Sequence, residues 1–276
     1  MRKFIVLLAS LLLLTGCSQN VEPENPYRLK QQTVERYSFE AVQLVRSDYT
    51  YDEMGRVIET STYYDDAWHS TRQYTHDAYG NILNTRETFA DGTENAHKET
   101  LTLDDQHRVI RSESVSNDER TAMTEYSYNA AGQITRHNIY RYGIMDGMDI
   151  NSFTDYTYNR KGNLIRQDVR WEPDNGNHGY ILYTYQNNRL AREETYQGEA
   201  LESYTEYTYD ETGLIRTANA CEADGTPHTR HVTTYDEYGN TLEVVAYAYY
   251  HDRMVHGEAD ETPDSRTTYV YELKGE

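Results

Sequence analysis

The stretch YTYDEMGRVI, residues 49–58, contains the pattern that decides the fold of this chain. Its Tyr-Thr-Tyr start alternates with a period of two and is rich in strand formers, which predicts a short β-strand. Asp52 then begins a tight turn, and Gly55 takes the left-handed backbone position that glycine adopts without steric cost. Two aliphatic residues and a second strand follow, so the stretch is predicted to be a hairpin with a three-residue loop and a bulge.

The hairpin register predicts which side chains share a face of the sheet. Tyr51 is expected opposite Val57, and Tyr49 opposite Glu59, because alternate residues of a strand point to the same side. Tyrosine ladders are therefore expected to run across successive strands, and each pair would contribute roughly 0.2–1 kcal/mol. The composition supports a structural role for these rings, since the chain has 28 tyrosines and 4 phenylalanines.

The same phrase recurs along the chain at intervals of about 25 to 30 residues. In one copy His107 occupies the glycine position and must take a positive φ without being glycine. About eight such hairpins predict an all-β chain built as a long antiparallel meander. Open sheets of more than about ten strands curl, split or close, so we expect a strongly twisted, curled sheet that is spiral or barrel-like. The turn glycines of the repeats are Gly55, Gly80, Gly132, Gly162, Gly213 and Gly239.

The phrase Y-x-Y-D-x-x-G-R/N-L-I resembles the RHS or YD repeat of bacterial RHS proteins, insecticidal toxin-complex shells, wall-associated proteins and animal teneurins. Residues 49–58 form the closest copy, and residues 207–213 and 235–240 form near copies. The resemblance extends over most of residues 45–276 through eight degenerate units. It implies a β-strand shell or spiral and an extracellular location.

The first residues predict export and lipid anchoring. Arg2 and Lys3 precede an apolar run that is shorter than the roughly 20 residues of a membrane-spanning helix, which is typical of a secretory signal. The run ends in Leu-Thr-Gly-Cys, which resembles a bacterial lipobox, and Cys17 would be lipidated as the first mature residue. We therefore expect a signal peptide at 1–16, a lipidated cysteine and flexible tether at 17–36, and a β domain at 37–276. The mature protein is predicted to face the cell exterior or the periplasm, held to the membrane by lipid.

Composition and motifs narrow the function classes. A formal net charge of −20 repels nucleic acid, so no nucleic-acid partner is expected. The sequence has no phosphate-binding loop, no H-E-x-x-H, no G-x-S-x-G and no paired C-x-x-C. Turn chemistry explains the aspartates of the repeats, so no metal site and no cofactor are predicted. We expect a protein that is not an enzyme, and we interpret Cys221 as a partly buried small residue.

The interruptions of the repeat are the predicted binding features, because insertions in repeat proteins map to loops on one face. They fall at 140–151, 170–180 and 249–265, with a fourth loop around Trp68. Aromatic side chains on such loops can stack on sugars or on partner side chains. The alternative is that these loops are tolerated variations in length. The candidate binding residues are Trp68, Tyr142, Trp171, His178, Tyr249, His251 and His256.

Two functions are compatible with these features. The first is a surface lipoprotein that binds or adheres at the cell envelope, with a glycan or an envelope protein as its partner. The second is a structural or accessory role, such as an immunity-like partner of a larger RHS or envelope protein. An envelope hydrolase has the least support, because no catalytic motif is present.

Overall fold

The computed structural model describes residues 25–37, 42–142, 148–171, 178–248 and 263–274, which form eighteen β-strands and no helix. Within these ranges no helix is long and apolar enough to cross a membrane. The strands are β1 (Tyr27–Tyr37), β2 (Val42–Tyr51), β3 (Val57–Tyr64), β4 (Ala67–His76), β5 (Ile82–Phe89), β6 (Glu94–Leu103), β7 (Val109–Ser116), β8 (Glu119–Tyr128), β9 (Ile134–Tyr142), β10 (Met148–Tyr158), β11 (Leu164–Trp171), β12 (His178–Gln186), β13 (Arg189–Gln197), β14 (Ala200–Tyr209), β15 (Ile215–Glu222), β16 (Pro227–Tyr235), β17 (Thr241–Ala248) and β18 (Ser265–Leu273).

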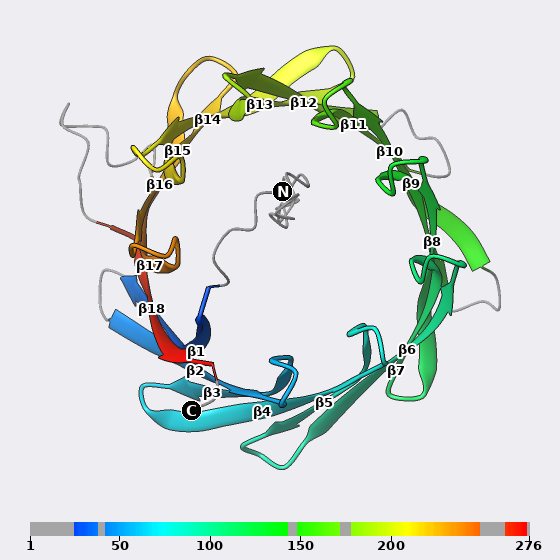
Figure 1. Cartoon of the computed structure of the whole chain (residues 1–276), viewed down its shortest axis with the longest axis vertical. Coiled ribbons are helices and arrows are strands. Elements are labelled where there is room, and N and C mark those ends of the chain that lie inside the picture. The colour runs from blue at the N-terminus through cyan, green and yellow to red at the C-terminus, as the bar shows by residue number, and fades with distance from the viewer. Residues whose placement is uncertain (1–24, 38–41, 143–147, 172–177, 249–262, 275–276) are drawn as a thin grey trace, which may run out of the picture.

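The strands form one closed antiparallel barrel (Figure 1). Each strand pairs with the next in sequence, and β1 pairs with both β2 and β18. The predicted all-β antiparallel meander is therefore confirmed. The predicted curled sheet of about eight repeats is corrected to a closed cylinder, because β1 pairs with the last strand and leaves no edge. Residues 27–36, which were predicted to belong to the tether, form part of β1.

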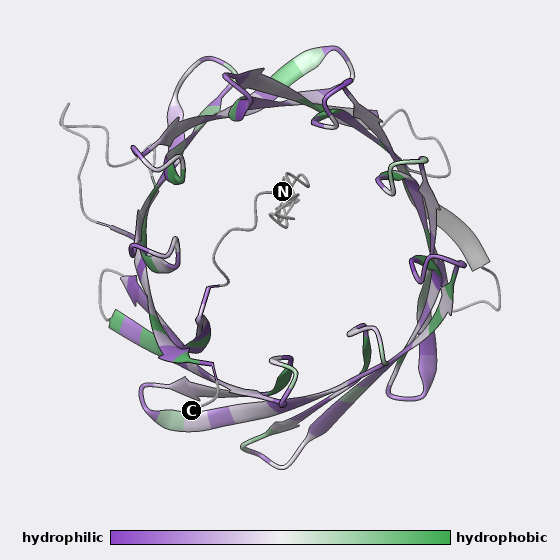
Figure 2. Ribbon diagram, in the orientation of Figure 1, coloured by the Kyte–Doolittle hydropathy of each residue, from purple (hydrophilic) through white to green (hydrophobic). Residues whose placement is uncertain are grey.

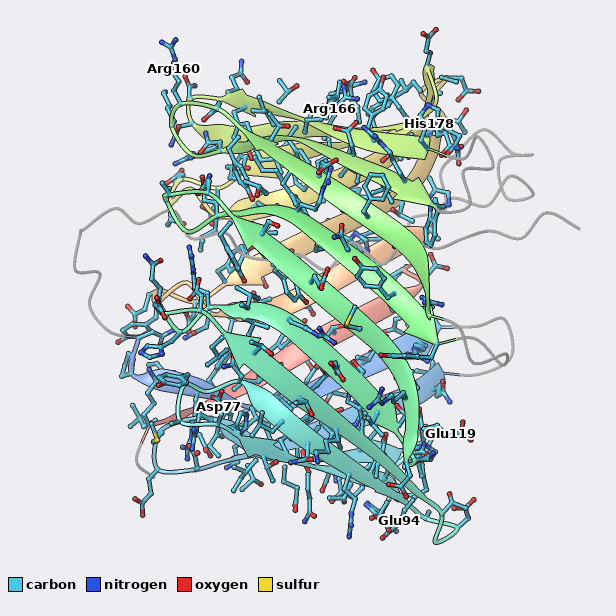
Figure 3. The ribbon with its side chains drawn as sticks, turned by 90° about the vertical axis from the view of Figure 1, so that its right-hand side faces the viewer. Asp77, Glu94, Glu119, Arg160, Arg166 and His178 are labelled. Carbon is cyan, nitrogen blue, oxygen red and sulfur yellow. The ribbon has the colours of Figure 1, made fainter. Side chains whose placement is uncertain are left out.

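The barrel has two rims of different construction. The repeat turns, here called YD turns, lie at one end, where Asp77 and Arg160 are labelled in Figure 3. The other connections lie at the opposite end, where Glu94, Glu119 and His178 are labelled. We call these ends the turn rim and the loop rim. The strands run between them at a tilt, as closure of a sheet requires.

Seven YD turns share one hydrogen-bond pattern, which Asp52 and Gly55 illustrate. The amide of Asp52 donates to the carbonyl oxygen of Arg56 at 2.9 Å, and the Gly55 amide donates to the Asp52 carbonyl oxygen at 3.0 Å. The six predicted turn glycines all have positive φ, and His107 takes the same position at φ 62°. The β12–β13 hairpin differs, since Asn187 and Asn188 form a two-residue turn.

A β-bulge follows each of these eight turns and corrects part of the predicted register. In the first hairpin, Tyr51 lies opposite Val57 as predicted, but Glu59 lies opposite Thr50 rather than Tyr49. The shift arises because Ile58 is an extra residue on β3. The aliphatic residue that ends the repeat phrase therefore occupies the bulge.

Backbone hydrogen bonds fix which side chains point into the barrel. The amide of Asn159 donates to the carbonyl oxygen of Asn163, so Thr157, two residues earlier, also directs its polar backbone groups toward β11. Figure 1 shows the strands following one another anticlockwise, and Figure 3 shows that the YD turns form the near rim of that view. In an L-residue strand that runs upward with the side chain toward the viewer, N–H and C=O point to the right. Seen from outside, β11 lies to the right of β10, so Thr157 points outward, and Tyr156 and Tyr158 point inward.

The barrel has no thick hydrophobic core. Among the described residues, only Met123, Leu164 and Val245 are buried hydrophobic side chains. Hydropathy alternates along the strands rather than concentrating in one layer (Figure 2). Stability must therefore come from the closed hydrogen-bond ladder and from side-chain pairs on the two walls.

Candidate functional site

The size of the barrel indicates a wide interior. Eighteen strands spaced about 4.7–4.9 Å apart and tilted by roughly 40° enclose a backbone cylinder about 35 Å across. Tyrosine side chains that point inward shorten this span by about 6 Å on each side, which leaves a lumen of about 20 Å. Barrels of 16–18 strands hold an aqueous channel for this reason. The inner wall is the first candidate surface.

The first tyrosine of the repeat phrase bonds to a polar side chain on the preceding strand. The hydroxyl of Tyr156 on β10 lies 3.0 Å from Nδ1 of His137 on β9. The hydroxyl of Tyr183 on β12 donates to Oε1 of Gln167 on β11 at 3.1 Å. Tyr49 makes the equivalent bond to Gln32 at 3.0 Å. This belt of hydroxyls joins successive hairpins around the barrel.

The second tyrosine bonds to the backbone. Its hydroxyl donates to the carbonyl oxygen of a residue at or near the turn-rim end of the preceding strand. The described bonds are Tyr51 to Leu29, Tyr128 to Val109 at 2.7 Å, Tyr158 to Ile134 at 2.8 Å, Tyr209 to Leu190 at 2.5 Å, Tyr235 to Ile215 at 2.8 Å and Tyr271 to Thr241 at 2.8 Å. A ring that belongs to one strand and bonds to the preceding strand must lie along the wall, so its face is turned toward the lumen.

Burial against this concave wall perturbs the tyrosines. Desolvation is the largest cause and raises the pKa of Tyr156 and of Tyr271 to about 12. It also lowers the pKa of His137 and His231, which therefore favour the neutral form. The inner wall is a polar, aromatic surface on which few side chains carry charge.

The outer wall carries the opposite chemistry. Arginine and carboxylate side chains pair across neighbouring strands, as Arg136 and Asp155 do at 2.5 Å and Arg192 and Glu206 do at 2.8 Å. Arginines also cover aromatic rings, and the Arg192 guanidinium lies 3.8 Å from the centre of the Tyr204 ring. The lipid-facing band of a transmembrane barrel is apolar, and a buried arginine costs about 2–4 kcal/mol there. The outer wall is therefore suited to contact with water.

The predicted binding residues lie at the loop rim but do not converge. Trp68 at the start of β4 is 43% exposed, and its ring nitrogen donates to Thr71 at 3.0 Å. Trp171 at the end of β11 is 39% exposed. The strand register turns Trp171 toward the lumen and Trp68 toward the outside. His178 begins β12 and is exposed, so these residues line one rim without forming one pocket.

The remaining predicted residues are partly outside the described ranges. Tyr142 ends β9 at the loop rim, where the Arg120 guanidinium lies 6.0 Å from its ring centre. Cys17, Tyr249, His251 and His256 lie outside the described residues. Within the described ranges no group of three histidine, cysteine or carboxylate side chains could hold a metal ion.

Sequence reasoning missed the side chain that distinguishes one hairpin from the others. Glu193 on β13 lies opposite Tyr183, at a position where the other hairpins have neutral residues such as Thr60 and Gln167. Desolvation is the main cause that raises the pKa of Glu193. An alignment of the repeats against one another shows this carboxylate as the exception, and that signal was present in the sequence.

No protein-family model matches the sequence, and no curated protein matches it. Among solved structures, the fold is similar to a porin-like protein from Bacteroides uniformis, with a TM-score of 0.49 and 12% identity over 88% of this chain and 98% of the other. It is similar to a porin-like protein from Bacteroides vulgatus, with a TM-score of 0.35 and 10% identity over 89% and 99% of the two chains. It is also similar to TcdB2-TccC3-TEV, with a TM-score of 0.31 and 12% identity over 82% of this chain and 16% of the other.

Proposed function

We propose that the chain is a non-enzymatic bacterial lipoprotein of the RHS/YD-repeat class that binds a partner at the cell envelope, a glycan or another envelope protein. The observation that carries the proposal is the opposite placement of the chain start and the predicted binding loops. The Tyr27 ring at the start of β1 contacts Tyr238 in a YD turn, so the chain enters the barrel at the turn rim. Trp68, Tyr142, Trp171 and His178 all lie at the loop rim.

Lipid on Cys17 would fix the direction of the barrel. The ten residues from Cys17 to Pro26 are joined by nine peptide links and span at most about 30 Å when extended. The turn rim would then stay near the membrane, and the loop rim would face away from it. The charged outer wall supports a barrel that stands in water beside the membrane rather than within it.

Membrane fractionation of Cys17→Ser tests the anchoring. The variant is expected to leave the membrane fraction, because lipid alone would hold the protein there. If Cys17→Ser is processed and still sediments with membranes after a salt wash, the anchoring proposal is wrong.

A glycan array tests the recognition by the loop rim. The full chain with Trp68→Ala and Trp171→Ala is expected to lose at least about tenfold in affinity for a glycan that the unaltered chain binds. Tyr79→Ala, an exposed YD-turn residue at the opposite rim, is the matched control and should bind normally. Equal binding by all three proteins would contradict recognition by these loops, and binding to envelope proteins but to no glycan would assign the partner to the protein class.

A further inference from the structure

Glu193 stands out on the inner wall because it is a carboxylate without a cationic partner. On the outer wall the adjacent residue, Glu194, pairs with Arg192 at 3.1 Å. Among the described residues no lysine, arginine or histidine lies within ion-pairing distance of the Glu193 carboxylate, and its hydrogen-bond donor is the Tyr207 hydroxyl. Half-burial of a carboxylate without a counter-charge is unfavourable, and an opposite charge within about 4–6 Å would favour the ionised form.

Aromatic rings surround this carboxylate on both sides. Tyr183 lies directly opposite Glu193 on β12, and Tyr185 follows it on the same inner face. On the other side, Thr205 of β14 lies opposite Glu193, and Tyr207 is the next inward residue of that strand. Tyr183 and Tyr185 therefore flank the carboxylate on β12, and Tyr207 flanks it on β14.

Cations already cover equivalent rings elsewhere in the barrel. The guanidinium of Arg108 lies 4.5 Å from the centre of the Tyr128 ring, and that of Arg189 lies 5.4 Å from the centre of the Tyr209 ring. Among the described residues no arginine lies over Tyr183, Tyr185 or Tyr207. The wall thus repeats a ring surface that attracts cations, and this surface is uncovered around Glu193.

We propose that Glu193, Tyr183, Tyr185 and Tyr207 form a binding site on the lumen wall for a small organic ammonium ion. The carboxylate supplies the counter-charge, and the tyrosine faces supply cation–π contacts of about 0.5–1 kcal/mol each where they are exposed. The Tyr207 hydroxyl holds the carboxylate in place through its hydrogen bond. The lumen, about 20 Å wide, gives such an ion access. The site lies on the wall rather than among the loop-rim residues. Ammonium binding at this site can therefore be tested independently of ligand binding by the loops.

Equilibrium dialysis of the full chain in detergent against radiolabelled choline tests the site. Choline should bind saturably, with one ion per chain, and its neutral isostere 3,3-dimethylbutan-1-ol should not compete. Glu193→Gln, which keeps the size and a hydrogen-bond acceptor, should weaken choline binding at least fivefold. The matched control is Glu194→Gln, which removes the neighbouring carboxylate on the outer wall and should leave choline binding unchanged.

A second variant separates loss of the site from loss of the fold. Tyr183→Leu keeps the carboxylate and removes one ring, and should weaken choline binding about threefold while the circular dichroism spectrum stays that of a β-barrel. Unchanged choline binding by folded Glu193→Gln would overturn the proposal. Equal loss in Glu194→Gln, or equal competition by the neutral isostere, would overturn it as well.

Discussion

At the scale of single residues, the hydroxyl group explains why tyrosine rather than phenylalanine fills the repeat. In several phrases the first tyrosine bonds to a side chain of the preceding strand and the second bonds to its backbone, as Tyr156 and Tyr158 do. A phenylalanine at either position would keep the ring and lose the link between hairpins. The tyrosines of the Tyr-x-Tyr strands are therefore a means of joining strands in a barrel without a thick core.

Tyr158→Phe should show the contribution of one such link. The change removes the 2.8 Å bond to the Ile134 carbonyl oxygen and leaves that oxygen without its side-chain donor. We expect the free energy of unfolding to fall by about 0.5–1.5 kcal/mol, which urea denaturation can measure. Tyr79→Phe is the control, because Tyr79 lies exposed in a YD turn and its ring stacking on His107 is kept. Equal stability of Tyr158→Phe and the unaltered chain would contradict the fastening role.

Glu193 should make stability depend on pH in a defined direction. Burial raises the pKa of Glu193 in the folded chain, so the folded state holds the proton more tightly than the unfolded state does. The contribution of this group to stability is therefore present below the ordinary glutamate pKa and is lost as pH rises through the folded-state value. Glu193→Gln should melt at a higher temperature than the unaltered chain at neutral pH, and the difference should vanish near pH 4, at about the ordinary glutamate pKa. A difference that grows on acidification would contradict this reading.

At the scale of elements, the YD turn is the part of the fold that the sequence predicts best. Asp52 and Gly55 have local chemistry that specifies their turn without help from the rest of the chain. The bulge after the turn changed the register, because the extra residue Ile58 interrupts the two-residue alternation from which the facing pairs were predicted. The sequence also could not show whether the tyrosines point into the barrel or out of it. Alternation shows which side chains share a face of the sheet, but not which face becomes the inner wall.

Gly55→Ala should measure the backbone requirement of the turn. Gly55 has a φ of 77°, and a Cβ atom there would meet nothing within 4 Å, so any cost comes from the backbone conformation alone. We expect destabilisation of about 1–2 kcal/mol, the cost of a left-handed conformation for an L-residue. His107→Gly is the reverse change in the unit that already uses a non-glycine residue, and should be stabilising or neutral once the loss of stacking on Tyr79 is included. Thermal unfolding should show a lower melting temperature for Gly55→Ala, and an equal or higher melting temperature for His107→Gly, than for the unaltered chain.

At the scale of the whole molecule, closure of the barrel depends on a strand that lacks the repeat phrase. β1 covers Tyr27–Tyr37, which has no turn glycine and no Tyr-x-Tyr, so most of it was predicted to be part of the tether. Pairing of β1 with β18 is a contact between the two ends of the sequence, so no local pattern reports it. The candidate loops were found from breaks in periodicity. The repeats also mark Glu193 as an exception, but its place among tyrosines on the inner wall depends on the strand register.

A disulfide across the seam between β1 and β18 tests whether the barrel is closed. Val34 and Thr267 lie opposite one another on β1 and β18, so cysteines at both positions can form a cross-strand disulfide. In a chain that also carries Cys17→Ser and Cys221→Ser, Val34→Cys with Thr267→Cys should form one intramolecular disulfide under mild oxidation, detected by peptide mass spectrometry. The control pair, Val34→Cys with Thr154→Cys on the distant strand β10, should not form it. Intermolecular disulfides alone, or no disulfide in the folded seam pair, would show that the sheet is open and would contradict the account.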